Sequence, residues 1–378
     1  MSGKASTPEP TLVMGTMSGT SCDGLDVVLC RIGRSGQPVE LLALNSMAYP
    51  RAWSERLQQL GAEDLAGVKK TEQEWTAWVL KSLQSCVAGW RVSHGEPSLL
   101  GFSGHTWYHD PGGRGTAAIG DAAALANGLG IPVVADYRSA DVAAGGQGAP
   151  LVPLFDAHVF GGYAGCINLG GIVNLSILPT DGGAVRAWDV AGCNLLLNRQ
   201  ARRLGMSYDA GGERAARGHC LTATLEALNA WPFLAQQPPK SLAAEDLAML
   251  HSELDGIESV EDALATGVEW VAAAVGKALE SAPHPGRLLL TGGGAHNAFL
   301  VGRMAAHMPR GWTAEVPGSM WVDGKEAAAF AWLAWRTMQG LPTALASVTG
   351  ANNDTCGGEV FGNFATREGQ WAPRNLEG

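Results

Sequence analysis

A glycine-rich turn between two apolar segments constrains the fold of this chain most strongly. The apolar residues Leu12–Met14 lead into Gly15–Asp26, which is rich in glycine, hydroxyl and carboxylate side chains, and the apolar residues Val27–Leu29 follow. Apolar segments separated by a short glycine-containing turn are typical of a β-hairpin. The pattern therefore predicts strand–turn–strand, in contrast to the strand–loop–helix of a Walker phosphate loop.

The residues of this turn are suited to contact phosphate. Gly19 and Gly24 allow positive φ and close approach of the backbone, and successive turn amides with hydroxyl donors beside them form an anion-binding nest. Asp23 and Asp26 would repel phosphate unless a divalent cation lay between them, which indicates Mg²⁺ held largely through water molecules. A Ser/Gly-rich hairpin without a ligand fits the same residues, so both interpretations stay open.

Two further glycine segments occur later in the chain. Cys166–Ser176 is an apolar strand interrupted by Gly170 and Gly171, so it predicts a second hairpin. Two such hairpins, each beginning one half of the chain, indicate duplicated domains that face one nucleotide. The segment Thr291–Asn297 places a glycine triplet between a buried strand and a helix, where a flat group such as adenine or ribose can lie against the backbone.

Length, charge and cysteine content narrow the class of protein. A chain of 378 residues usually exceeds one hydrophobic core, so we expect two domains. The net charge of -10 argues against nonspecific nucleic-acid binding, and no apolar run is long enough to predict a membrane span. The seven cysteines form no C-x-x-C pair and are typical of a reduced cytoplasmic protein.

The pattern of apolar residues predicts the order of domains and elements. We expect a disordered leader at residues 1–10, a first domain at 11–140 and a second at 141–351, with residues from about 352 to 378 packing back on the first. Strands are expected at 39–49, 99–111, 131–135 and 287–290, and helices at 53–60, 71–90, 121–129, 151–160, 221–228 and 260–279.

Four polar side chains outside the glycine segments are candidates for ligand contacts. His105 follows a glycine at a strand tip. Arg138 lies near the glycine-rich loop 145–148, which suits either a ligand-approach surface or an interdomain linker. Asp189 follows the second hairpin, although an aspartate there also fits the cap of the next helix. Glu326, in the first turn of a helix expected from residue 323, fits either a ligand contact or an interaction with the helix dipole.

Several motifs occur in order along nearly the whole chain, from about residue 14 to residue 351. They are Met17–Ser21 with Asp23-Gly24, Asp141–Ala143, Gly145–Pro153, Asn168–Ile172, Gly292–Ala295 with Asn297, and Lys325–Ala327. Together they resemble the motifs of the anhydro-N-acetylmuramic acid kinase family, and the first and third are quite specific to it. The resemblance implies the two-domain α/β fold shared by actin and sugar kinases, with ATP and Mg²⁺ in a cleft between the domains.

The resemblance also implies a reaction. A 1,6-anhydro sugar is opened by water and phosphorylated at O6, which gives N-acetylmuramic acid 6-phosphate in the reuse of cell-wall fragments. Asp189 would take a proton from the water that attacks C1, and Glu326 would help to hold that water or the sugar. His105, Arg138 and Asn194 would contact the sugar. A cytoplasmic homodimer is expected on the same basis.

The nucleotide and the metal are assigned to the glycine segments. Asp23 would hold Mg²⁺ through water. The residues expected to contact ATP are Gly19, Thr20, Ser21, Cys22, Asp23, Gly24, Leu25, Asp26, Gly170, Gly171, Asn174, Gly292, Gly293, Gly294 and Asn297.

Three segments and one position differ from the family pattern, the position being Asn198, where the family usually has an aspartate in the next helix. Asp189–Asn194 replaces the usual Asp-x-Gly-Pro-Gly-Asn, Leu242–Glu245 replaces Thr-Gly-Arg-Glu, and Phe102–Gly104 replaces Ser-His-Gly. These differences leave two alternatives to the muramic sugar kinase. One is a kinase of another anhydro sugar or polyol such as levoglucosan, and the other is a catalytically weakened member that binds nucleotide or sugar as a sensor.

Overall fold

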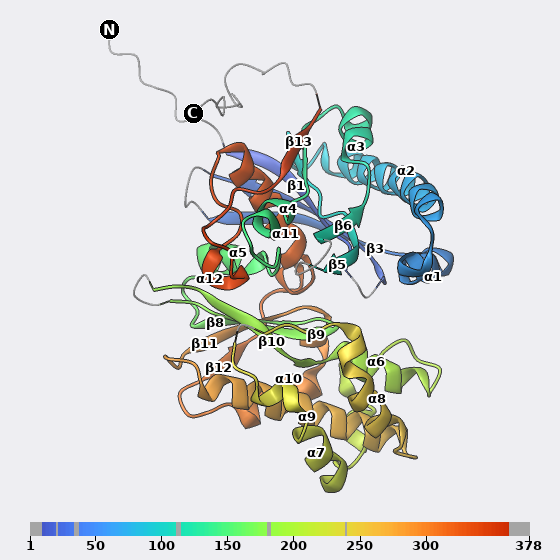
Figure 1. Ribbon diagram of the computed structural model, residues 1–378, viewed down its shortest axis with the longest axis vertical. Coiled ribbons are helices and arrows are strands. Elements are labelled where there is room, and N and C mark those ends of the chain that lie inside the picture. Colours follow the sequence, from blue (N-terminus) through green and yellow to red (C-terminus); the bar gives the residue numbers. More distant parts are fainter. Residues whose placement is uncertain are drawn as a thin grey trace. The chain divides into compact units, whose positions relative to one another are not determined.

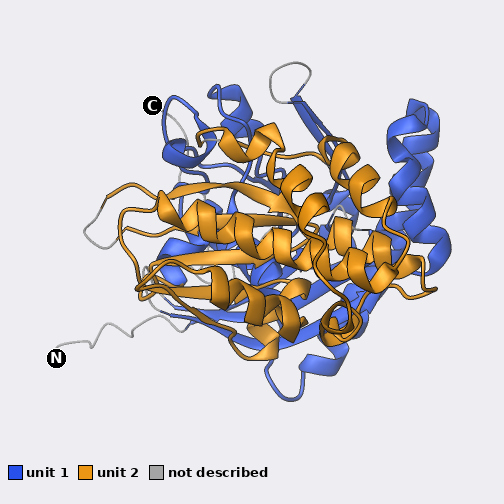
Figure 2. Ribbon diagram, turned by 90° about the horizontal axis from the view of Figure 1, so that it is seen from below, with its two compact units in different colours: residues 1–159, 324–378 blue, residues 160–323 orange. Residues whose placement is uncertain are grey.

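The computed structural model describes residues 10–19, 22–33, 38–110, 115–179, 183–238 and 240–362. The chain divides into two compact units, residues 1–159 with 324–378 and residues 160–323 (Figure 2). It passes from the second unit back to the first within one helix, α11 (Ser319–Met338). All but the last residue of the leader expected at residues 1–10 lies outside the described residues.

The first unit is built on a mixed sheet with the strand order β13-β7-β4-β1-β2-β3 (Figure 1). The predicted hairpin is confirmed, because β1 and β2 pair antiparallel from Thr11 opposite Ile32 to Met17 opposite Asp26. The strands of this unit are β1 (Thr11–Met17), β2 (Gly24–Ile32), β3 (Val39–Ala48), β4 (Leu99–Gly101), β7 (Val133–Ala135) and β13 (Glu359–Phe361), with β5 (His105–Asp110) and β6 (Gly115–Ile119) in a separate hairpin.

Helices cover both faces of this sheet. Helices α2 and α3 pack on the face that carries Met14 and Leu100. On the opposite face α11 lies so close that a Cβ atom at Gly15 would lie 2.0 Å from the carbonyl oxygen of Ala327, so glycine is required for this approach. The helices of this unit, besides α11, are α1 (Arg51–Gln59), α2 (Leu65–Trp90), α3 (Ala122–Leu129), α4 (Ser139–Ala143), α5 (Val152–Val159) and α12 (Ala346–Thr349).

Local capping explains where the helices of the first unit begin. The sequence predicted a helix from Thr71, but α2 starts at Leu65 because the Asp64 carboxylate accepts a hydrogen bond from the Gly67 amide. The prediction for α3 is confirmed, and Asp121 caps it in the same way. Both helices carry apolar residues at helical spacing toward the sheet, which is the pattern that predicted them.

The second unit repeats the strand order of the first. Its sheet has the order β10-β9-β8-β11-β12, in which β8, β9 and β10 form an antiparallel meander and β11 and β12 add in parallel beside β8. The first unit has the same arrangement in β3-β2-β1-β4-β7. The repetition confirms the duplicated, two-domain α/β fold. The strands are β8 (Gly165–Leu169), β9 (Ile172–Ile177), β10 (Arg186–Gly192), β11 (Arg287–Thr291) and β12 (Thr313–Glu315).

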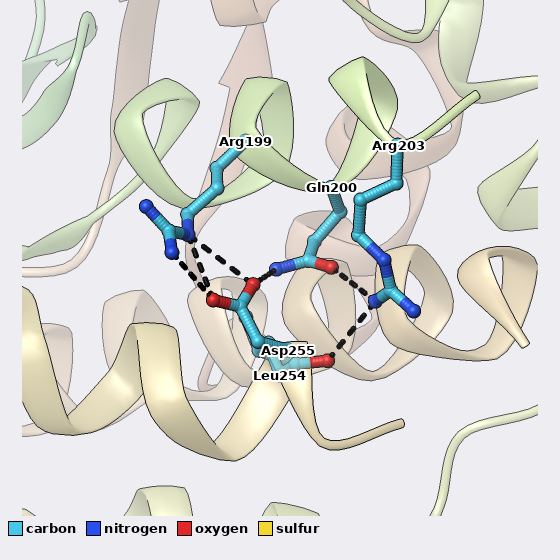
Figure 3. Close-up of polar contacts among 5 residues, drawn as sticks. All are labelled: Arg199, Gln200, Arg203, Leu254 and Asp255. Atoms are coloured by element: carbon cyan, nitrogen blue, oxygen red, sulfur yellow. Dashed lines mark hydrogen bonds and ion pairs between the residues drawn. The ribbon is translucent and has the colours of Figure 1, made fainter. Parts of the chain in front are cut away.

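A long buried helix organises the second unit. Apolar side chains of α9 pack with those of the sheet in one core that includes Leu175, Trp270 and Leu290. Helices α6 and α8 are joined at the surface, where Asp255 accepts hydrogen bonds from Arg199 and Gln200 (Figure 3). The helices are α6 (Asn194–Arg202), α7 (Thr222–Asn229), α8 (Ala248–Asp255), α9 (Val260–Glu280) and α10 (Ala298–His307).

The units differ in their bounds from the domains expected at 11–140 and 141–351. Residues 141–159 belong to the first unit because α5 packs on α11, where buried Asp156 accepts a hydrogen bond from Lys325 over 2.9 Å. The segment around α12 is held in the same unit by Thr349, whose hydroxyl donates to buried Asp141. Strand β13 then pairs with β7, so the described part of the C-terminal segment lies on the first unit.

Candidate active site

The turn of the first hairpin is closed by its backbone. The amide of Cys22 donates to the carbonyl oxygen of Gly19 over 3.1 Å, and Cys22 has a positive φ of 51°. Thr20 and Ser21, which we expect to contact ATP, lie outside the described residues. Asp23, the expected Mg²⁺ contact, is exposed, as a carboxylate that binds a hydrated cation must be.

The residues that follow the turn also serve the sheet. A Cβ atom at Gly24 would lie 2.6 Å from the carbonyl oxygen of Met47, so β3 alone requires glycine there. Leu25 is fully buried in the core of the first unit, which leaves only its backbone for a ligand. Asp26 lies on β2 opposite Met17. The expected ATP contacts of these three residues stay predictions.

A buried polar network lies beside the turn. The Ser18 hydroxyl lies 2.8 Å from the Tyr49 hydroxyl and 2.9 Å from Nδ1 of His105, and Sγ of Cys22 lies 3.7 Å from Nε2 of the same ring. The Trp75 indole donates to the Tyr49 hydroxyl over 3.2 Å. These contacts join the residues that follow β1 and β3 with α2 and β5 beside the turn.

Burial keeps this network uncharged. It lowers the pKa of His105 to about 4, and it raises the pKa of Cys22 to about 11 and that of Tyr49 to about 12. His105 is only 2% exposed and both of its ring nitrogens contact side chains of the first unit. The structure therefore places it against the hairpin, whereas its expected contact with the sugar stays a prediction.

The turn of the second hairpin is closed by a helix. The carbonyl oxygens of Gly170 and Gly171 accept hydrogen bonds from the amides of residues 193–195, at the start of α6. The side-chain amide of Asn194 donates to the carbonyl oxygen of Leu169 over 3.0 Å. These bonds satisfy amides that have no partner within their own helix. The turn and the helix start consequently form one rigid corner.

Asp189 lies within β10 and faces Asn174 of β9. The Asn174 amide donates to one carboxylate oxygen, and the backbone amide of Leu242 donates to the other over 2.7 Å. Burial raises the pKa of Asp189, and both hydrogen bonds oppose that shift. The alternative in which Asp189 caps the next helix is wrong, because Cys193 occupies the cap position of α6.

The glycine triplet is a close-packed junction. Gly292 has a φ of 82°, and a Cβ atom there would lie 2.5 Å from Oδ1 of Asn168. A Cβ atom at Gly294 would lie 2.9 Å from the carbonyl oxygen of Leu169, so both positions require glycine next to the second hairpin. Asn297 caps α10 by accepting a hydrogen bond from the Leu300 amide. Nucleotide contacts of the triplet, including Gly293, stay predictions.

Arg138 and Glu326 lie close enough in the first unit for the charge of one to act on the other. The Arg138 guanidinium donates to the carbonyl oxygen of Gly148 over 2.7 Å. Burial lowers the pKa of Arg138, and the negative charge of Glu326 opposes that shift. Glu326 lies about two turns inside α11, which begins at Ser319, so the helix-dipole interpretation of its position is wrong.

The loop 145–148 lies wholly within the first unit, so it does not link the two units. Its shape is set by the buried Asp141 carboxylate, which accepts a hydrogen bond from the Gly148 amide. A Cβ atom at Gly146 would lie 2.2 Å from Oδ2 of Asp141. The loop thereby wraps the carboxylate and presents Gly148 to Arg138.

Arg138 also borders a cavity of about 460 Å³ within the first unit. The polar lining includes Ser103, Thr106 and the carboxylates of Glu72, Asp121, Asp136 and Glu359, and the apolar lining includes Tyr137 and Phe330. A mixed lining with a few polar groups is typical of small-molecule sites. No group of three or more His, Cys, Asp or Glu side chains within the described residues is arranged to hold a metal ion, and no helix in that part of the chain is long and apolar enough to cross a membrane.

Comparison with known proteins identifies the family. A model of the family described as anhydro-N-acetylmuramic acid kinase matches residues 11–363. A relative of that name from Thiobacillus denitrificans is 37% identical over 94% of this chain and 97% of its own length. Another, from Ruegeria sp., is 35% identical over 93% and 95%. The chain belongs to the anhydro-N-acetylmuramic acid kinase family. It is therefore an ATP-dependent sugar kinase.

Solved structures resemble the fold more distantly. The activator of 2-hydroxyisocaproyl-CoA dehydratase from Clostridium difficile, with bound ADPNP, is 12% identical with a TM-score of 0.46, covering 86% of this chain and 94% of that one. At that level the likeness adds nothing to the family assignment.

The predicted residues of this family member fall into two groups, one in each unit. In the first unit the turn of the hairpin lies with His105, and Arg138 lies with Glu326. In the second unit Asn174 contacts Asp189, and the triplet packs against the hairpin whose turn bonds to the start of α6.

Sequence reasoning missed two contributors. The Ser18 hydroxyl was expected as a donor to phosphate, and the structure places it against Tyr49 and His105. Tyr49 lies 31 positions from Ser18, and no local pattern connects them. Leu242 acts through its backbone amide, which side-chain identity does not reveal.

Proposed function

We propose that this family member opens 1,6-anhydro-N-acetylmuramic acid with water and phosphorylates O6. The oxygen of water bonds to C1, the C1–O6 bond breaks, and O6 takes the γ-phosphoryl group of ATP, so that N-acetylmuramic acid 6-phosphate and ADP leave. The observation that carries the proposal is Asp189, a carboxylate oriented by two hydrogen bonds in a site where burial raises its pKa.

Asp189 is the proposed base for the attacking water. Asn174 and the Leu242 amide each hold one oxygen of the carboxylate, so its orientation is set before substrate binds. A raised pKa makes the carboxylate a stronger base than an ordinary aspartate. O6 needs no base of its own, because cleavage of the C1–O6 bond already leaves it with an electron pair.

The glycine turns are the proposed contacts of ATP. Phosphoryl transfer depends mainly on positioning and on neutralising the charge of the phosphates. Backbone amides of the first turn, between Ser18 and Cys22, would face the phosphates. Asp23 would hold Mg²⁺ through water, and the metal, when bound, would neutralise phosphate charge. The second turn and the triplet 292–294 would contact the rest of the nucleotide.

Arg138 and its cavity are the proposed sugar site in the first unit. The muramic sugar carries a lactyl carboxylate, and a partly buried guanidinium is a suitable partner for it. Burial lowers the pKa of Arg138, so the cation is poorly solvated and gains by meeting an anion. Glu326, whose charge acts on Arg138, would hold the sugar or the water. Levoglucosan has no carboxylate, so Arg138 favours the muramic sugar over that alternative.

The sensor alternative rests on the changed residues after Asp189 and Lys240. The contact that Leu242 makes with Asp189 comes from the backbone, and any residue other than proline can supply it. Replacement of the usual threonine by leucine therefore leaves the proposed base oriented. This observation favours an active kinase.

The test is turnover of a panel of anhydro sugars. The protein is incubated with ATP, Mg²⁺ and 1,6-anhydro-N-acetylmuramic acid in ¹⁸O-labelled water, and we expect a 6-phosphate with the label at O1 only. Asp189→Asn should lower kcat by about a thousandfold, since general bases contribute about 10²–10⁴-fold. Asp255→Asn, which alters a surface ion pair of α6 in the same unit (Figure 3), is the matched control and should retain activity.

Other outcomes of the panel select the alternatives. Turnover of levoglucosan without turnover of the muramic sugar would assign a different anhydro sugar. Tight ATP binding without turnover of any sugar would assign a sensor. Label in the phosphate group would show simple hydrolysis of ATP and would contradict coupled ring opening.

We also propose a cytoplasmic homodimer. All seven cysteines are free and five are buried, which suits a reducing compartment. The dimer is inferred from membership of the family. Light scattering on the purified protein would distinguish it from a monomer.

A further inference from the structure

The buried carboxylate of Asp141 joins two segments of the first unit. One of its oxygens accepts a hydrogen bond from the Gly148 amide over 2.8 Å, and the other accepts one from the Thr349 hydroxyl over 2.7 Å. The carbonyl oxygen of Asp141 also accepts a hydrogen bond from the Gly146 amide. Asp141 is fully buried, so the loop 145–148 and the end of α12 are both held to a group that solvent does not reach.

Gly148 passes this constraint on to Arg138. Its amide is held by Asp141, and its carbonyl oxygen accepts the hydrogen bond from the Arg138 guanidinium over 2.7 Å. Gly148 has a φ of 67°, and a Cβ atom there would lie 2.9 Å from Cγ2 of Val142 and 3.2 Å from Cβ of Arg138. Glycine is therefore required where the loop meets the arginine. The direction of the carbonyl group depends on the bond that Asp141 makes to the same residue.

The direction of the Arg138 guanidinium matters because of its surroundings. The Gly148 carbonyl is the one hydrogen-bond acceptor that the described residues give to this guanidinium, which has five N–H donors. Four carboxylates line the adjoining cavity, and Arg138 is the one Lys or Arg among its lining residues in the described part of the chain. Turned toward those carboxylates, the guanidinium would pair with them. Held at Gly148, it keeps donors for an anion that enters the cavity.

We propose that Asp141 is a positioning residue that aims Arg138 at the carboxylate of the sugar by way of Gly148. This role rests on the proposed function, in which Arg138 meets the lactyl carboxylate. It gives a task to Asp141–Ala143 and Gly145–Pro153, two of the motifs shared with the family that the proposed chemistry does not use. Thr349 takes part because its hydroxyl holds the second oxygen of Asp141.

The test compares two sugars that differ by the lactyl group. Calorimetry measures the Kd of 1,6-anhydro-N-acetylmuramic acid and that of 1,6-anhydro-N-acetylglucosamine, which has no carboxylate. We expect Asp141→Ala to raise the first Kd about tenfold, because a charge-assisted hydrogen bond is strong only when its geometry is kept. The second Kd should change by less than about twofold. A general loss of stability would affect both sugars alike.

A double-mutant cycle shows whether Asp141 acts through Arg138. Arg138→Ala removes the guanidinium and should abolish the preference for the muramic sugar. Adding Asp141→Ala to that variant should raise the Kd by less than about twofold further, since the group that Asp141 positions is already gone. Two independent contributions would instead multiply.

Asp141→Asn separates hydrogen-bond geometry from charge. Its amide oxygen can accept from Gly148, and its amide nitrogen can donate to the Thr349 hydroxyl, whose proton then goes to the carbonyl oxygen of Leu345, 3.2 Å away. We expect this variant to keep the preference for the muramic sugar within about threefold. The matched control is Asp64→Ala, because Asp64 also accepts a hydrogen bond from a glycine amide in the same unit, at the exposed start of α2.

Several outcomes would overturn the role of Asp141. They are an unchanged preference in folded Asp141→Ala, an equal rise of both Kd values, multiplication of the two losses in the cycle, and a loss in Asp141→Asn as large as that in Asp141→Ala. If Asp141→Ala does not fold, Gly148→Ala decides, since it displaces the carbonyl group and leaves the carboxylate in place. That variant should lose the preference to the same extent.

Failure of the proposed function is distinguishable from failure of this role. If Arg138→Ala loses the preference and Asp141→Ala keeps it, only the positioning role falls. If Arg138→Ala keeps the preference, the proposed contact with the lactyl carboxylate is wrong and the positioning role falls with it. If the muramic sugar binds but no sugar is turned over, the proposed reaction fails, while the preference in binding still decides the role of Asp141.

Discussion

The two glycine hairpins have the same place in two repeated sheets, yet they are held in different ways. In both, the first strand of the unit turns back on the second and has a parallel neighbour on its other side. The first turn is supported by side chains, through Ser18, His105 and Cys22. The second turn is supported mostly by backbone amides at the start of α6, to which the Asn194 side chain adds one hydrogen bond to Leu169.

The difference extends to charge. The network at the first turn is neutral, because burial moves the pKa values of its titratable groups away from pH 7. Beside the second turn, a hydrogen bond from Asn174 orients the carboxylate of Asp189. The duplicated scaffold therefore carries a neutral side-chain network beside one turn and an oriented carboxylate, the candidate base, beside the other. The comparison shows that sheet topology positions a turn, while a few side chains determine its chemistry.

The largest expected effect is a loss of stability when a glycine of the first hairpin is replaced. Gly15→Ala should lower the free energy of unfolding by about 3 kcal/mol, because the new Cβ would overlap the backbone of α11. Gly171→Ala, at the second turn, meets only the flexible Leu195 side chain at 3.0 Å and should cost less than about 1 kcal/mol. Urea unfolding of both variants measures the contrast. Equal losses would mean that the second turn is as tightly packed as the first.

A smaller effect should appear on acidification. His105 has a pKa of about 4 in the folded chain and an ordinary value of 6.5, so its neutral form is favoured by folding. The corresponding stability is complete above pH 6.5 and is lost as pH falls toward 4, by roughly 2 to 3 kcal/mol.

The contribution of His105 to the acid sensitivity is measured by comparing the wild-type protein with a variant that lacks the imidazole. Unfolding of wild-type protein and His105→Gln is compared at pH 7 and pH 4.5, and the variant should lose less stability than the wild type. The same loss in both proteins would assign the acid sensitivity to carboxylates and would remove the neutral network as the distinguishing feature of the first hairpin.

The smallest effect concerns the corner of the second hairpin. Asn194→Ala removes a hydrogen bond to Leu169 and should cost about 1 kcal/mol of stability. Asn198→Ala, on the same helix, is the control for helix propensity. If the KM for the anhydro sugar also rises in Asn194→Ala, then Asn194 contacts substrate as expected from the resemblance. A purely structural role predicts the stability loss with unchanged KM.

Local features of the fold were predictable because local physics produces them. The hairpins follow from glycine turns between apolar segments, and α3 and α9 follow from apolar residues at helical spacing behind Asp121 and Ser259. The helix predicted from Asp323 begins earlier in the structure, at Ser319, because no residue type before Asp323 indicated a helix. The domain bounds were missed because packing of α5 on α11, through Lys325 and Asp156, joins segments far apart in the sequence.

The candidate site, like the fold, could be predicted from the sequence only in part. Residue types and their order were sufficient to recognise the family and to select Asp189, Glu326 and the glycine segments. They could not reveal that Asn174 and a backbone amide orient Asp189, or that Arg138 lies with Glu326. Each of these contacts joins residues from different elements, and backbone donors carry no signature in the side-chain sequence.

The sequence alone determined the family, the duplicated α/β architecture and the turns, because glycine conformation and apolar spacing act over a few neighbouring residues. The tertiary structure decided what those turns contact. It brought His105 to Ser18 and Cys22 across 87 and 83 positions of the chain. It also made the resulting network neutral, since burial, which no single residue encodes, shifts the pKa of each group away from its charged form.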